Sequence, residues 1–187
     1  MKLEKMMHKL LYVCLGGTTL SGLHRLLGGK RWELISNPDL PVNGNFSGAA
    51  INLKILDDAY TFMHELFHGY QAFQEVTATW NGATANLEVE AQIAKVMFML
   101  NSRDAGEFSK NWEELGKKNI DTNFRTMTNA LNYKGILLEP EFQAQFNSYF
   151  KTMGQFYERT DPYNYVWDDS RTLRENMKNI QYLAKDC

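Results

Sequence analysis

The chain has 187 residues and a formal net charge of −2, with 44% hydrophobic and 22% charged residues. A domain of this length buries about 70% of its unfolded surface, so folding alone requires neither a disulfide nor a metal. The composition excludes intrinsic disorder, and the charge lacks the basic excess of a protein that binds nucleic acid or anionic membranes. The longest near-apolar run, Ile93–Leu100, contains Lys95 and is too short for a membrane span. We therefore expect one soluble globular domain over residues 1–187. We expect neither a transmembrane segment nor a nucleic-acid partner, and the oligomeric state stays open.

The first 22 residues allow two interpretations. Lysines, the apolar stretch LLYVCL and small residues follow one another in the order of a secretory signal peptide, whereas Glu4 and the weakly apolar GGTT segment argue against one. The alternative is an N-terminal helix whose apolar stripe consists of Met6, Leu10, Leu11 and Cys14. A cleaved leader predicts a secreted or periplasmic protein, and a retained helix predicts a cytoplasmic one. The two cysteines, Cys14 and Cys187, are too few for a disulfide scaffold or a CxxC site, and cleavage would remove one of them.

The remaining pattern predicts an α+β fold dominated by helices. A short strand is expected at Arg31–Ser36, then a turn-rich segment over 37–48, then a strand at Ala49–Ile55. Asp57 and Asp58 offer an N-cap for a helix that ends near Glu75. After the loop VTATWNGAT, further helices are expected at about Ala85–Leu100, 105–118, 121–132, 139–158 and 168–184.

The C-terminal part is rich in aromatic residues. We interpret those that recur at helical spacing as core packing rather than as a substrate groove: Phe142, Phe146, Tyr149, Phe150, Met153, Phe156 and Tyr157. The segment TDPYNYVWDD that follows is expected to form a loop beside a cleft, and its aspartates match no calcium-binding loop.

The most informative motif lies in the helix that follows Asp58. His64, Glu65 and His68 form the pattern H-E-x-x-H, and helix positions i and i+4 lie ~40° apart, so both imidazoles can bind one metal ion. Glu65 can reach a water molecule at the open position of that metal and act as a general base. The apolar face of the same helix lies roughly 160° from the histidines. The two histidines are therefore expected to line a cleft rather than to sit in the core.

A catalytic zinc ion needs a third protein ligand if one position is to stay open. The other histidines, His8 and His24, lie far upstream, so we expect a downstream carboxylate. Glu88 and Glu90 on the next helix are the candidates, and because they lie ~200° apart only one of them can face the metal. Glu88 shares a small polar strip with Gln92, whereas Glu90 falls within an apolar arc.

HELFH followed twenty positions later by Glu88 resembles the gluzincin type of zinc metallopeptidase. The run from Glu88 to Gln92, E-V-E-A-Q, is similar to the E-x-x-A-D or E-x-x-A-N pattern of short bacterial zinc peptidases. This resemblance covers about Asn45–Leu100 and implies a small zincin-like domain with one zinc ion bound by His64, His68 and Glu88. Gln92 stands where that pattern has an Asp or Asn that orients a ligand histidine. The resemblance also implies that Asn45–Ile55 is an edge strand along which a substrate peptide lies.

The implied reaction is the hydrolysis of a bond in a peptide or protein substrate, with Glu65 as the general base. A tetrahedral oxyanion needs a further donor, for which the candidates are Tyr133, Tyr149, Tyr157, Tyr163 and Tyr165. Two alternatives stay open. The chain can be a non-catalytic metal-binding or protein-interaction domain on the same scaffold, or a peptidase that acts on one dedicated protein partner.

Overall fold

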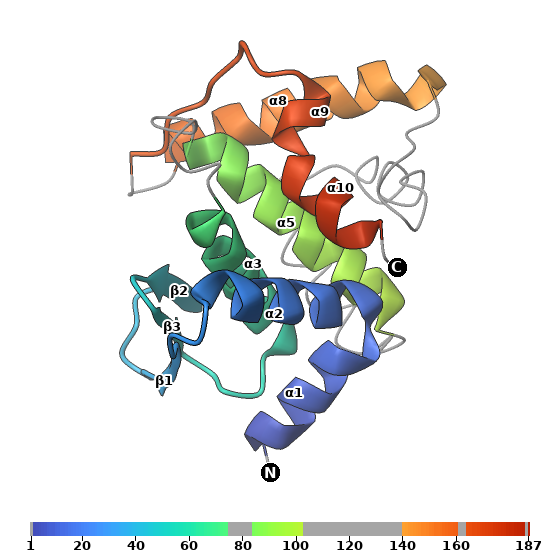
Figure 1. Ribbon diagram of the computed structural model, residues 1–187. Helices are drawn as coiled ribbons and strands as arrows, with labels where there is room; N and C mark the ends of the chain where they lie inside the picture. The colour runs from blue at the N-terminus through green and yellow to red at the C-terminus, as the bar shows by residue number, and fades with distance from the viewer. Residues whose placement is uncertain (1, 75–83, 103–139, 161–163, 186) are drawn as a thin grey trace.

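The computed structural model describes residues 2–74, 84–102, 140–160, 164–185 and 187. It has the expected helix-dominated α+β fold with a small three-stranded sheet (Figure 1). The elements are α1 (Lys2–Tyr12), α2 (Cys14–Leu27), β1 (Glu33–Ser36), β2 (Gly44–Ser47), β3 (Ala50–Leu53), α3 (Ala59–Phe73), α5 (Thr84–Asn101), α8 (Pro140–Thr160), α9 (Leu173–Asn176) and α10 (Lys178–Ala184). The helices predicted near 105–118 and 121–132 and the loop VTATWNGAT lie outside the described residues, apart from the last residue of that loop.

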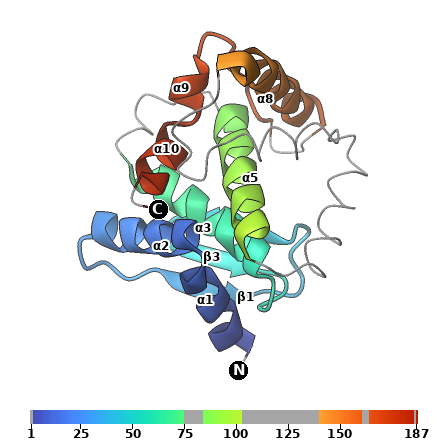
Figure 2. The same ribbon diagram turned by 90° about the vertical axis from the view of Figure 1, so that its right-hand side faces the viewer.

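Helix α3 lies at the centre of the described structure, because α1, α2, α5 and the sheet all pack against it (Figures 1 and 2). The carboxylate of Asp58 caps its N-terminus and accepts hydrogen bonds of 3.0 Å from the backbone N–H groups of Tyr60 and Thr61. The helix predicted from this cap to about Glu75 is thereby confirmed. The polar residues Thr61, Glu65 and Gln71 are buried along with the apolar face. Helix α3 is therefore buried over a wider part of its circumference than its apolar stripe alone predicts.

The sheet has the strand order β1-β3-β2, in which β3 pairs with β1 in parallel and with β2 in antiparallel orientation. The strands predicted at Arg31–Ser36 and Ala49–Ile55 are confirmed as β1 and β3. The segment Asn45–Ile55, expected as a single edge strand, is instead a hairpin. The chain reverses at Gly48, which has a φ of +63° that glycine adopts readily. Its first arm, β2, is the edge strand, and β3 lies in the middle of the sheet.

The N-terminal residues form two helices instead of one. The chain is extended at Val13, with φ of −94° and ψ of 123°, so α1 ends before α2 begins. The bend places Cys14 in a different helix from the other residues of the predicted apolar stripe, of which Met6 and Leu10 are buried and Leu11 is 58% exposed. Helix α2 runs to Leu27, and both helices contribute to the hydrophobic core.

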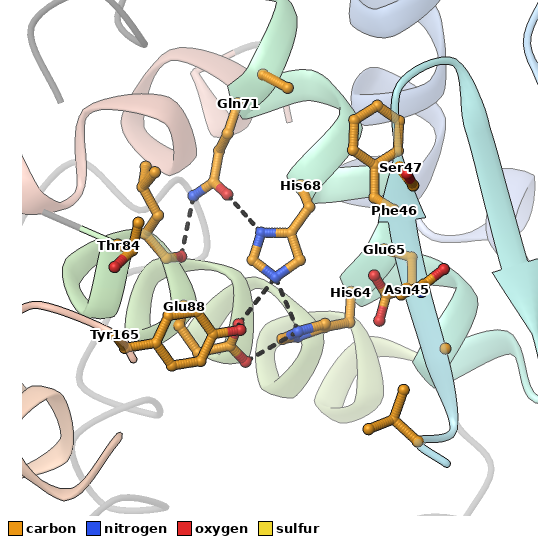
Figure 3. Close-up of a pocket in the computed structure, with 14 residues that line it drawn as sticks. Asn45, Phe46, Ser47, His64, Glu65, His68, Gln71, Thr84, Glu88 and Tyr165 are labelled. Atoms are coloured by element: carbon orange, nitrogen blue, oxygen red, sulfur yellow. Dashed lines mark hydrogen bonds and ion pairs between the residues drawn. The ribbon is translucent and has the colours of Figure 1, made fainter. Parts of the chain in front are cut away.

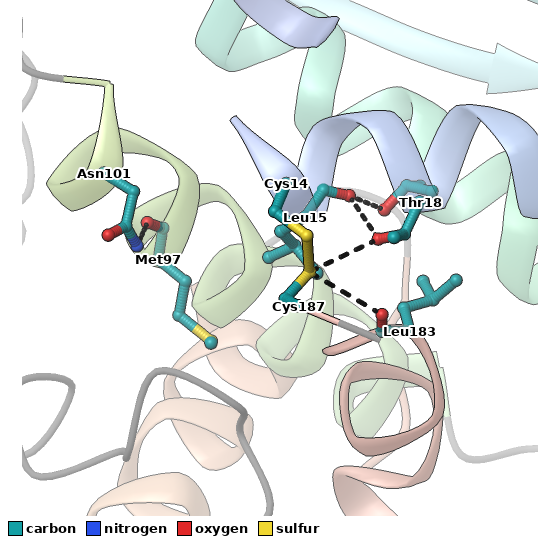
Figure 4. Close-up of a disulfide and its surroundings, with 8 residues drawn as sticks. Cys14, Leu15, Thr18, Met97, Asn101, Leu183 and Cys187 are labelled. Carbon is teal, nitrogen blue, oxygen red and sulfur yellow. Dashed lines mark hydrogen bonds between the residues drawn. A yellow bond between two sulfur atoms is a disulfide. The ribbon is translucent and has the colours of Figure 1, made fainter. Parts of the chain in front are cut away.

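A disulfide joins Cys14, at the start of α2, to Cys187 (Figure 4). The two Cα atoms are 5.6 Å apart, although the residues are separated by 173 positions in the sequence. Helix α10 also packs against α2. The cysteine count did not indicate this link, which fastens the segment after α10 to the N-terminal helices.

Helices α8, α9 and α10 all contact α5, and α10 also packs against α2 (Figure 1). The helix predicted at 139–158 is confirmed as α8. The interpretation of its aromatic stripe as core packing is confirmed for Phe146, Phe150, Met153 and Tyr157, which are buried, whereas Phe156 is half-buried and lies outside the core. The helix predicted at 168–184 begins only at Leu173, because Thr172 and Glu175 form a capping box, and it is divided at Met177. In the described parts of the chain, no helix is both long enough and apolar enough to span a membrane.

Candidate metal centre

His64 and His68 project from the same side of α3, and Glu88 points toward them from α5 (Figure 3). Nε2 of His64 lies 3.1 Å from Oε1 of Glu88, and Nε2 of His68 lies 3.0 Å from Oε2 of the same carboxylate. The two Nε2 atoms are 3.0 Å apart. Within the described residues, these three side chains are the group of histidines, cysteines and acids whose donor atoms converge, all within 4.8 Å of one another.

This convergence fits a small divalent metal ion. In a tetrahedral zinc site with bonds of about 2.0–2.1 Å, neighbouring ligand atoms are about 3.3 Å apart, which is close to the separations above. Two imidazole nitrogens and a carboxylate would leave one position of the tetrahedron for water or substrate. The side chains of His64 and Glu88 are 12% and 10% exposed, so the donor atoms are shielded while the site keeps access to solvent.

Burial disfavours the charged forms of His68 and Glu88, but their mutual attraction outweighs it. The negative charge of Glu88 and its hydrogen bond raise the pKa of His68 to about 9. In return, the two histidines hold the pKa of Glu88 well below its usual range. The imidazole of His68 is therefore cationic at neutral pH, and a metal ion that bound at its Nε2 atom would have to displace the proton there.

Glu90 turns away from the histidines and is fully buried. Its carboxylate accepts hydrogen bonds from the backbone N–H groups of Asn179 and Ile180, at 2.8 and 3.1 Å. It also accepts from Nδ2 of Asn179 at 2.9 Å and from Nε2 of Gln71 at 3.0 Å. Burial raises the pKa of Glu90 to about 7, although these hydrogen bonds oppose the rise. The structure thus separates the two candidate carboxylates: Glu88 meets the histidines, and Glu90 meets the first turn of α10.

Gln71, which the sequence analysis did not consider, contacts a histidine where Gln92 was expected to do so. Oε1 of Gln71 lies 2.9 Å from Nδ1 of His68. Gln92 is buried on α5, and no hydrogen bond joins it to either histidine in the described structure. The expectation for Gln92 came from a family pattern on α5, whereas the i,i+3 spacing of His68 and Gln71 on α3 was available as a local signal. Nδ1 of His64 is buried and has no hydrogen-bond partner among the described residues.

Glu65 is 6% exposed and lies where β2 crosses α3, beside His64 (Figure 3). The crossing is close, because a Cβ atom at Gly44 would lie 2.9 Å from Cγ of Glu65 and 2.7 Å from Cγ2 of Thr61. Only glycine allows β2 to approach the helix so closely. The close approach places the edge strand directly beside the carboxylate of Glu65.

A cavity of about 590 Å³ contains the three converging side chains and Glu65 (Figure 3). Its walls come from β2 and the residues before it, from α3, from the first two turns of α5 and from Tyr165. The apolar part of the lining consists of Val42, Phe46, Ala72 and Leu87. No lysine or arginine of the described residues lines it, so the charged side chains in the wall are acidic or histidine.

Tyr165 is the tyrosine that the structure brings into this cavity. Its hydroxyl donates to Oε2 of Glu88 at 3.3 Å. Tyr157 is buried and packs edge-on against the ring of Tyr165, with centroids 6.2 Å apart. Tyr133 and Tyr163 lie outside the described residues, and so does the side chain of Tyr149.

The segment that carries Tyr165 is held against the start of α5. The carbonyl of Val166 accepts from the N–H of Ala85 at 3.0 Å, and the N–H of Val166 donates to Oγ1 of Thr84 at 2.9 Å. The first of these bonds satisfies a backbone N–H at the helix N-terminus that the helix itself leaves unpaired. The following Trp167 packs against Phe150 of α8, with ring centroids 6.0 Å apart. Contacts on both sides therefore fix the position of Tyr165. The loop predicted beside a cleft agrees with the described residues 164–169, whereas Thr160 belongs to α8 and residues 161–163 lie outside the described structure.

Comparison of the chain with known protein families, with curated proteins and with solved structures finds no match. The resemblance to gluzincins accordingly rests on the residues of the site, and any function must be argued from their geometry.

Proposed function

We propose that the protein is a zinc-dependent peptidase. The observation that carries the proposal is the convergence of His64, His68 and Glu88 in one cavity that also contains the carboxylate of Glu65. A metal site that serves only structure is usually closed by four protein ligands. The arrangement here offers three donors beside a free acid, which is the composition of a hydrolytic site.

Zinc is the metal that the donor set favours. Imidazole nitrogens and a carboxylate oxygen suit Zn²⁺ in tetrahedral geometry, whereas Ca²⁺ and Mg²⁺ prefer sites made of oxygen alone. A zinc ion held by His64, His68 and Glu88 supplies Lewis acidity and lowers the pKa of a water molecule to about 7. We expect one such ion for each chain.

The side chains around the ligands can perform the proton transfers of amide hydrolysis. Glu65 would accept a proton from the attacking water and pass it to the leaving nitrogen. The hydroxyl of Tyr165, which lies at the Glu88 carboxylate, can donate to the oxygen of the scissile carbonyl as negative charge develops there.

The edge strand β2 supports an extended peptide as the substrate. The N–H of Lys54 donates to the carbonyl of Asn43, and Asn45 lies opposite Asn52 in the antiparallel ladder. Because backbone groups in such a ladder turn alternately inward and outward, those of Asn45 face β3 and those of Phe46 face the open edge. An extended peptide can pair with the outward N–H and C=O of Phe46 as an additional strand beside Glu65.

Zinc content and peptide hydrolysis test the proposal together. We expect about one zinc per chain in protein purified without added metal, and cleavage of a peptide library by wild-type protein. The Glu65→Gln variant is the negative control, because it should retain the bound zinc and lose the peptide cleavage. Cleavage retained in Glu65→Gln would exclude Glu65 as the general base. Zinc without cleavage would favour the non-catalytic metal-binding domain, and failure to take up zinc on titration would remove the metal centre altogether.

A further inference from the structure

We propose that Gln71 and Glu90 are positioning residues that hold a hydrogen on Nδ1 of His68, so that Nε2, which donates to Glu88 in the metal-free protein, is the nitrogen that gives up its proton to a metal ion. The inference rests on the proposed metal centre and names the groups that prepare it. A row of hydrogen bonds runs from the start of α10 through Glu90 and Gln71 to His68.

The side-chain carboxylate of Glu90 is held by four hydrogen bonds, each from a donor group. Oε1 accepts from the backbone N–H groups of Asn179 and Ile180, and Oε2 accepts from Nδ2 of Asn179 and Nε2 of Gln71. All four partners of the carboxylate are hydrogen-bond donors, so both oxygens act as acceptors. Burial of the group makes the loss of any of these bonds costly.

These acceptors determine how the amide of Gln71 is turned. Its nitrogen lies 3.0 Å from Oε2 of Glu90 and 3.1 Å from the backbone carbonyl of Leu87. The carbonyl of Leu87 can only accept, the ionised carboxylate of Glu90 likewise accepts, and a side-chain amide donates only from its nitrogen. The opposite orientation would place the amide oxygen of Gln71 against two acceptors. The network therefore resolves the orientation of the amide.

With its nitrogen committed to Glu90 and Leu87, Gln71 presents its oxygen to Nδ1 of His68, at 2.9 Å. An amide oxygen cannot donate, so Nδ1 of His68 carries the hydrogen. In a neutral imidazole the other nitrogen then has a free lone pair. That nitrogen, Nε2, is the atom that faces Glu88 and His64.

The two histidines therefore differ in the contacts of their Nδ1 atoms. Nδ1 of His64 has no partner among the described residues, so no described side chain acts on its tautomer through that nitrogen. His68 is connected through two side chains to Asn179 and Ile180 of α10, which supply three of the four hydrogen bonds to Glu90. The C-terminal helix thereby takes part in building the site without contacting it.

Glu90→Gln tests the proposal because it exchanges one acceptor for a donor. Its oxygen must still accept from the two backbone N–H groups of α10, so its nitrogen would face Gln71. The amide of Gln71 is then expected to turn over, donate to Nδ1 of His68 and favour the tautomer with hydrogen on Nε2. We expect the zinc dissociation constant to rise by about 10- to 100-fold. Glu33→Gln is the matched control, since Glu33 is exposed on β1 and the charge change is the same.

The double variant Gln71→Glu/Glu90→Gln supplies a rescue. A carboxylate at position 71 can accept from both His68 and the new amide at position 90, so most of the lost zinc affinity should return. Gln71→Leu is the second test, should Glu90→Gln fail to fold by circular dichroism: it removes the acceptor at His68 and should weaken zinc binding. Unchanged zinc affinity in folded Glu90→Gln or Gln71→Leu would overturn the proposal.

Nitrogen-15 NMR of the imidazole of His68 reads the tautomer directly in zinc-free protein at a pH where the ring is neutral, in a Glu88→Ala background that removes the carboxylate facing Nε2. Hydrogen on Nδ1 in Glu88→Ala and on Nε2 in Glu88→Ala/Glu90→Gln supports the proposal, and hydrogen on Nε2 in Glu88→Ala overturns it. This measurement requires no metal. Absence of zinc binding in wild type would therefore refute the proposed peptidase while the positioning role is still decided.

Discussion

Oε2 of Glu88 accepts hydrogen bonds from two directions, because Nε2 of His68 lies 3.0 Å away and the hydroxyl of Tyr165 lies 3.3 Å away. Tyr165 reaches this atom across 77 positions of sequence. The phenol therefore lies at the edge of the proposed metal position, on the wall of the cavity that faces β2.

Tyr165→Phe tests the catalytic role of this hydroxyl. The change leaves all three proposed ligands in place, so zinc affinity should stay close to that of wild type. Loss of a donor to the developing oxyanion should lower kcat by about 100- to 1,000-fold with little change in KM. Steady-state kinetics on a cleaved peptide measure the effect. Tyr157→Phe is the control, since Tyr157 packs on the same ring outside the cavity. Equal kcat losses in the two variants would indicate a packing effect.

Gly44→Ala tests the close crossing of β2 over α3. The new Cβ atom would lie 2.7 Å from Cγ2 of Thr61 and 2.9 Å from Cγ of Glu65. We expect a loss of about 1–3 kcal/mol in the free energy of unfolding, measured by urea denaturation. Gly17→Ala is the matched substitution in helix α2, where the nearest atom is 3.8 Å away, and it should stabilise the protein by up to about 1 kcal/mol. Destabilisation of the same size at both positions would show that the crossing is not tight.

The disulfide between Cys14 and Cys187 should contribute to stability by restricting the unfolded chain. Because it closes a long loop, its reduction is expected to cost about 2–5 kcal/mol of unfolding free energy. Guanidinium denaturation with and without reductant measures this difference. The double variant Cys14→Ser/Cys187→Ser should match the reduced wild type and should not respond to reductant. Identical midpoints for oxidised and reduced wild type would argue that the bond is absent or without effect.

The ion pair of His68 and Glu88 predicts a pH dependence for metal-free protein. The pKa of His68 rises from 6.5 to about 9 on folding, so its contribution is complete below about pH 6.5 and is lost as pH rises through 9. The pKa of Glu88 falls below 4.5, so its contribution is present above that pH and is lost as the pH falls further. Urea unfolding in the presence of a chelator should therefore show a decline in stability between pH 6.5 and 9.

His68→Gln should flatten that decline, since the titrating group is gone. Saturating zinc should flatten it as well, because the metal replaces the proton between the same ligands. Parallel pH profiles for wild type and His68→Gln, both free of metal, would show that other groups cause the loss.

The directions of the motif side chains could be predicted from the sequence because a helix converts spacing into geometry. His64 and His68 share a face of α3 for that reason, and the competition between Glu88 and Glu90 could be framed on a helical wheel. Which of these two glutamates faces the histidines depends on residues that are distant in sequence. The partner of Glu90 at the start of α10 lies 89 positions away, and local patterns carry no information about it.

Strand β2 and the position of Tyr165 were beyond prediction for a related reason. The sequence GNFS has the composition of a turn, and it forms a strand because Gly44 permits contact with α3 and because β3 offers a pairing partner. The sequence offered five candidate tyrosines without distinguishing them. Tyr165 lies in the cavity because its segment is hydrogen-bonded to the start of α5. In both cases tertiary packing outweighs local preference.

The bond from Cys14 to Cys187 closes residues 14–187 of the oxidised chain into a covalent ring. A single protease cut inside the ring opens it without releasing a fragment. Such nicked molecules would migrate in a denaturing gel as one species of nearly full mass, and separate into two bands only after reductant is added. Limited proteolysis of this protein therefore has to be compared in both gel formats, since the non-reducing gel alone would conceal single cuts between the two cysteines.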